Sequence, residues 1–97
     1  MRQSKQTLKL YEELVAELEK GKPRPQWKLE RKIVNNMLRS FEVQIQYQNA
    51  RTKHGAEDDS GISPEDRKNV KAAIELRRKI YRMMKEIKEH GTLSTWQ

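Results

Sequence analysis

The chain of 97 residues contains no cysteine, which excludes disulfide bonds and thiolate metal sites. Its four glycines stand singly, so no glycine-rich phosphate-binding loop is present. No apolar run approaches the roughly 18 residues that a membrane span needs. The first residues also lack the apolar stretch of a signal peptide. We therefore expect a cytoplasmic protein that does not enter a membrane.

Candidate catalytic and metal-binding groups are equally scarce. His54 and His90 are the only histidines, and both fall near predicted helix ends, where capping and solvent exposure are ordinary roles. The acidic run at residues 57–59 lacks the alternating ligand spacing and the central glycine of a calcium loop. We expect no enzymatic activity, no metal and no cofactor, and we expect the polar loop over residues 55–62 to be a dispensable connector.

Two helices are predicted in the first half of the chain. The first spans residues 4–20, starts at the potential cap Ser4 and stops before Gly21. The second spans residues 25–53, with Pro25 in its first turn. The side of the second helix that faces the core is expected to carry Trp27, Leu29, Ile33, Val34, Met37, Leu38, Phe41 and Ile45.

The segment from Phe41 to Gln48 also fits a β-strand, because apolar and polar residues alternate along it. Two observations favour a helix. The apolar stripe of the second helix continues through Phe41 and Ile45, and no second strand is evident to satisfy the backbone of the first. A strand paired across a dimer remains the open alternative.

The third helix has the clearest limits. Ser63 is a cap, Pro64 takes the first helical position, and Gly91 ends the helix, which gives a span of 63–90. Residues 92–97 are expected to form a flexible tail.

The apolar face of the third helix is unusually wide. At about 100° per residue it covers roughly 200° of the circumference, whereas packing against one neighbour needs only about 100°. Such a helix must contact more than one neighbour. We predict an all-α domain of three helices over residues 1–91, dominated by a long antiparallel hairpin of the second and third helices. We expect this domain to self-associate as a dimer, because an exposed apolar face of this size invites aggregation.

Arg77 lies near the centre of the wide apolar face. A buried guanidinium needs a partner, and three explanations stay open. Arg77 could form a salt bridge to a glutamate of the first helix, or pack its stem and extend its head to water, or contact an anion or an interface. The residues expected at an interface are Arg77, Tyr81, Met84, Trp27 and Tyr47.

The net charge of +7 and the isoelectric point near 9.8 arise mainly from the two long helices. Residues 23–55 carry seven basic and two acidic side chains, and residues 63–97 carry nine and five. Basic residues recur along one side of the third helix and near the start of the second. The candidate nucleic-acid-binding residues are Arg67, Lys71, Arg78, Arg82, Lys85, Lys28, Arg31 and Lys32.

Two classes of function fit this pattern. Phosphate groups need only positive charge, and the amide side chains of the second helix can hydrogen-bond bases or a protein surface. These amide residues are Asn35, Asn36, Gln44, Gln46, Gln48 and Asn49. This favours a non-catalytic regulatory protein that binds DNA or RNA. The alternative is a protein-binding adaptor or inhibitor that occludes a partner protein through exposed aromatic anchors.

Overall fold

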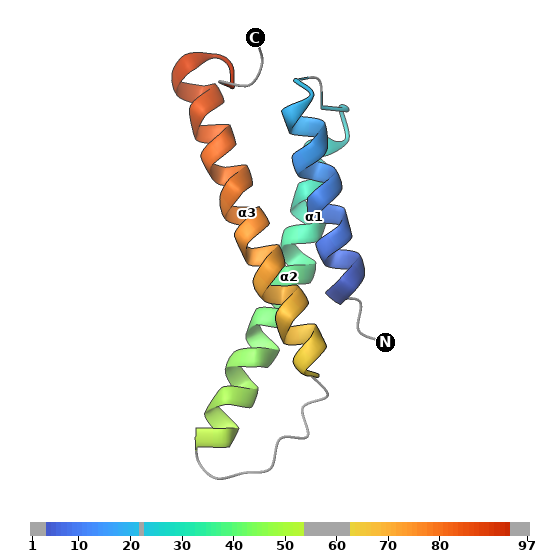
Figure 1. The fold of residues 1–97 in the computed structure, drawn as a ribbon, viewed down its shortest axis with the longest axis vertical. Helices are drawn as coiled ribbons and strands as arrows, with labels where there is room; N and C mark the ends of the chain where they lie inside the picture. Colours follow the sequence, from blue (N-terminus) through green and yellow to red (C-terminus); the bar gives the residue numbers. More distant parts are fainter. Residues whose placement is uncertain (1–3, 22, 54–62, 94–97) are drawn as a thin grey trace.

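In the computed structural model, the described residues form three helices, α1 (Ser4–Glu19), α2 (Trp27–Lys53) and α3 (Pro64–His90). The structure describes residues 4–21, 23–53 and 63–93, with only the backbone described at residues 51–53. α1 and α3 run in the same direction and α2 runs opposite to them (Figure 1). The all-α prediction is therefore confirmed. The strand alternative for residues 41–48 is wrong, because this segment lies within α2.

The ends of α3 form as its sequence predicts. The Ser63 hydroxyl accepts a hydrogen bond from the Asp66 backbone N–H at 3.1 Å, and the Asp66 carboxylate accepts one from the Ser63 N–H. This reciprocal capping box satisfies two backbone donors of the first turn. At the other end, Gly91 adopts φ 75°, a left-handed conformation that costs glycine little, and its N–H donates to the Ile87 carbonyl.

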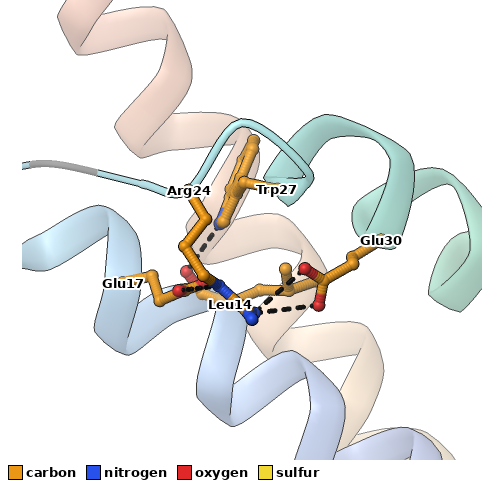
Figure 2. Close-up of polar contacts among 5 residues, drawn as sticks. All are labelled: Leu14, Glu17, Arg24, Trp27 and Glu30. Atoms are coloured by element: carbon orange, nitrogen blue, oxygen red, sulfur yellow. Dashed lines mark hydrogen bonds and ion pairs between the residues drawn. The ribbon is translucent and has the colours of Figure 1, made fainter.

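Residues of both α1 and α2 bind the connection between these two helices, as Figure 2 shows. The Arg24 guanidinium pairs with Glu17 of α1 and with Glu30 of α2. Beside it, the indole N–H of Trp27 donates to the Leu14 carbonyl at 3.0 Å. Because Pro25 lies in a turn, α2 begins at Trp27, two residues later than predicted.

The apolar core lies where the three helices meet. α3 packs along α1 and also contacts α2, so its wide apolar arc has two neighbours within one chain, as its width requires. The arc alone therefore does not demand a second copy. The buried apolar residues are Tyr11, Leu14, Val15, Leu18, Trp27, Val34, Leu38, Phe41, Val70, Ala73, Ile80, Met83 and Leu93.

The inward face of α2 is narrower than predicted. Leu29 and Ile33 were expected in the core, yet their exposed fractions are 60% and 50%. Val34 and Leu38 do face the core, and Gln48 is buried near the end of the helix. α2 therefore carries a second, outward apolar surface.

Two residues near the chain ends are packed more firmly than expected. Ser4, predicted to cap α1, is buried, and its hydroxyl instead donates to the Asp66 carboxylate and accepts from the Asn69 amide. Leu93, predicted to lie in a flexible tail, is buried against the core. The connector at 55–62 and residues 94–97 lie outside the described residues, so those predictions stay predictions.

A polar group lies within this core. Tyr11 has no exposed surface, and its hydroxyl donates a hydrogen bond to the Asn35 Oδ1 atom of α2. Burial raises the pKa of Tyr11 to about 12, because the phenolate would lose its hydration. The tyrosine therefore stays neutral at all physiological pH values.

Raising the pH above 10 should destabilise the protein through Tyr11. Because the folded pKa lies above the ordinary value of about 10, the stabilisation is complete below pH 10 and is lost as the pH rises through 12. Urea unfolding of the wild type and of Tyr11→Phe, at pH 9 and near pH 12, measures the contribution of the Tyr11 hydroxyl to stability. The free energy of unfolding of the wild type relative to Tyr11→Phe should fall by about 2 kcal/mol between pH 9 and pH 12. A difference that does not change with pH would contradict the prediction.

Candidate functional site

A polar groove of about 410 Å³ opens between α2 and α3. It lies beside the polar pair formed by Tyr11 and Asn35, and most of its side chains carry hydrogen-bonding or charged groups. Its lining residues are Asn35, Asn36, Arg39, Glu42, Val43 and Gln46 from α2, with Arg77 and Tyr81 from α3. We call this feature the polar groove.

An ion pair forms one wall of the polar groove. The two terminal nitrogens of Arg77 donate to the two carboxylate oxygens of Glu42 at 2.6 and 3.2 Å. Both side chains are about three-quarters buried. The hydrogen bond to Glu42 raises the pKa of Arg77 above its ordinary value, and burial opposes this change. The partner of Arg77 is thus a glutamate of α2 and not of α1, which corrects the salt bridge considered from the sequence.

The rim of the polar groove is exposed and positively charged. Arg39 and Gln46 extend from α2 and are exposed. Arg39 forms no ion pair within the part of the chain that the structure describes. Tyr81 contributes a half-exposed ring from α3. Because neighbours on a helix surface are three or four residues apart, Arg78 and Lys85 flank this ring.

One residue of the predicted basic stripe of α3 is hydrogen-bonded to α2, and the other four are exposed to solvent. The stripe consists of Arg67, Lys71, Arg78, Arg82 and Lys85. The Arg67 guanidinium donates to the side-chain oxygens of Gln48 and Asn49, which holds α3 against α2. Arg78 reaches Glu75 at 3.4 Å, but both side chains are exposed, so this pair is weak. The remaining three are exposed and have no acidic partner among the described residues.

The basic residues near the start of α2 do not join the polar groove. The Arg31 guanidinium lies 5.7 Å from the centre of the Trp27 ring, a cation–π contact at the edge of the core. Lys28 borders a separate apolar cleft together with Trp27 and Met84. Lys32 is exposed elsewhere on α2.

The five residues expected at an interface lie in different environments. Trp27 is buried in the core, Met84 packs partly against it, and Arg77 is paired with Glu42. Only Tyr47 and Tyr81 present exposed rings. The sequence could suggest Arg39 and Gln46 as basic and amide residues, but selecting them required the rotation of α2 relative to α3.

The chain matches no protein-family model, and no curated protein or solved structure is significantly similar to it. Among the described residues, no group of three or more histidine, cysteine or acidic side chains could hold a metal ion. In that same part of the chain, no helix is long and apolar enough to cross a membrane. The site must therefore be interpreted from its own residues.

The Arg77–Glu42 pair should couple more strongly than an exposed pair. A double-mutant cycle with Arg77→Gln and Glu42→Gln should give a coupling free energy above about 1 kcal/mol, because both groups are largely buried and doubly hydrogen-bonded. The same cycle on Arg78 and Glu75 is the control, and about 0.2–0.5 kcal/mol is expected there. Urea unfolding measures both, and equal coupling in the two cycles would contradict this assignment.

Proposed function

We propose that the protein is a cytoplasmic, non-catalytic regulatory protein that binds nucleic acid. The observation that carries the proposal is the set of outward cations on α3, of which Arg78, Arg82 and Lys85 are within four residues of the exposed Tyr81 at the polar groove. The basic stripe supplies contacts to phosphates, and the groove supplies contacts to a base. Positive charge and an aromatic ring on one surface are the combination that single-stranded nucleic acid requires.

The basic stripe supports binding that depends on salt and not on sequence. Lys71, Arg82 and Lys85 project from one side of one helix, and their charges are not neutralised by described acidic side chains. Each phosphate contact releases counterions, so affinity falls as the salt concentration rises. These contacts would position a strand without reading its bases.

The polar groove favours a single strand over a duplex. The half-exposed Tyr81 ring offers a face on which an unstacked base can lie. Gln46 offers an amide donor and acceptor beside it, and Arg39 offers a planar cation. In a duplex, the bases are stacked inside and their faces cannot reach Tyr81.

A protein-binding adaptor or inhibitor is the second candidate function. The observation that favours it is the set of exposed apolar side chains on α2, which includes Leu29 and Val43. If nucleic acid does not bind even at low salt, this second function becomes the better account.

Removing two cations from the basic stripe should flatten the salt dependence. Arg82→Gln combined with Lys85→Gln should reduce the slope of log affinity against log salt by up to about two units. The matched control is Lys5→Gln with Lys9→Gln, which removes the same charge from exposed positions on α1. Fluorescence anisotropy with a labelled single strand measures both slopes. Equal slopes in the two variants would show that net charge, and not the stripe, governs binding.

Replacing Tyr81 should distinguish single strands from duplexes. Tyr81→Leu removes a stacking surface worth about 1–3 kcal/mol per base, so single-strand affinity should fall about tenfold or more. Duplex affinity should hardly change. Tyr47→Leu is the control, since Tyr47 is also exposed, at 62% against 51% for Tyr81, but is not among the residues that line the groove. If Tyr81→Leu lost equal affinity for single strands and for duplexes, the proposal that the groove binds a base would be rejected.

A further inference from the structure

Four of the five large apolar side chains that the described residues expose lie on α2, with exposed fractions between 50% and 62%. They share one side of the helix with two exposed polar residues. We call this surface the outer stripe of α2, and it consists of Leu29, Ile33, Asn36, Ser40, Val43 and Tyr47.

The spacing of the outer stripe is that of a coiled-coil seam. Successive members are separated by four, three, four, three and four residues, which is the alternation of the a and d positions of a heptad. The stripe therefore stays on one side of the helix over about 27 Å. Its members are exposed, whereas the core-facing residues Val34 and Leu38 lie on the opposite side of α2.

We propose that a second copy of this chain covers the outer stripe, with the two α2 helices antiparallel about a two-fold axis. In this register Leu29 faces Tyr47 of the second copy, and Ile33 faces Val43. Asn36 faces Ser40 at the centre. Each layer joins an a position to a d position, as antiparallel coiled coils require. Large apolar groups thus meet at both ends and polar groups meet in the middle.

The symmetry of the stripe identifies the second copy as the occupant. A two-fold interface needs a surface complementary to itself, and the stripe reads apolar, polar, apolar from either end. The antiparallel orientation also sets the helix dipoles in opposition, which is favourable. An interface of one helix per subunit is small, so we expect dissociation in the micromolar range.

The flanks of the seam predict an unusual salt response. The second copy covers Asn36 and Val43, which also line the polar groove, and its Lys32 lies next to Gln46 at the rim. The two Arg39 side chains meet near the two-fold axis and repel one another. Added salt screens this repulsion, so the dimer should tighten as salt rises, in contrast to nucleic-acid binding.

Sedimentation velocity without nucleic acid, from micromolar to millimolar concentration, tests the proposal. The wild type should shift from monomer to dimer, and Arg39→Gln should dimerise at lower concentration. Ile33→Glu should remain monomeric, since the new carboxylates would be buried in the seam. Ala16→Glu, which adds the same charge at an exposed position of α1, should dimerise like the wild type. Circular dichroism checks that every variant remains helical.

A mixing experiment tests the orientation. Chains with Ile33→Glu and chains with Val43→Lys should each be monomeric alone but form a one-to-one dimer together, because positions 33 and 43 face one another only in the antiparallel register. A wild type that stays monomeric throughout, or Ile33→Glu that dimerises normally, would overturn the proposal. Failure of the mixture to dimerise would also reject it. If the wild type stays monomeric, a helix of another protein becomes the better candidate to cover the outer stripe.

Discussion

A polar layer inside the core determines how the three helices sit against one another. Tyr11 joins α1 to α2 through Asn35, and Arg77 joins α3 to α2 through Glu42. Separating either pair would leave a largely buried polar group without its partner, which costs more than the bond contributes. Rotations or shifts that preserve apolar contact but break these pairs are therefore disfavoured. The groove depends on the same layer, since Glu42, Arg77 and Asn35 all line it.

Local structure was predictable because its causes are local. The reciprocal bonds of Ser63 and Asp66 and the left-handed Gly91 fix α3 from residues adjacent to its ends. The rotation of α2 was not predictable in the same way. Leu29 and Ile33 were assigned to the core because apolar periodicity measures the width of an arc and not which part meets a neighbour. α2 carries two apolar surfaces, and the sequence pattern merges them.

One part of the candidate site could be predicted from the sequence and the other could not. The basic stripe of α3 follows from helical spacing alone, so its outward members could be listed from the sequence. The groove could not, because it needs α2 and α3 placed together. Arg67 illustrates the difference: it has the spacing of the stripe, yet Gln48 and Asn49 draw its guanidinium toward α2. The partner of Arg77 could not be predicted either, because helical periodicity describes one helix and Glu42 lies on another.

The distribution of acidic partners explains why the surface remains positive. Both acidic side chains of α2 are engaged, Glu30 by Arg24 and Glu42 by Arg77. On α1, Glu17 pairs with Arg24 and Glu19 with Lys79. These four carboxylates therefore pair with cations between elements and do not neutralise the cations on the outer surfaces. The positive charge that remains is concentrated on the outward sides of α2 and α3.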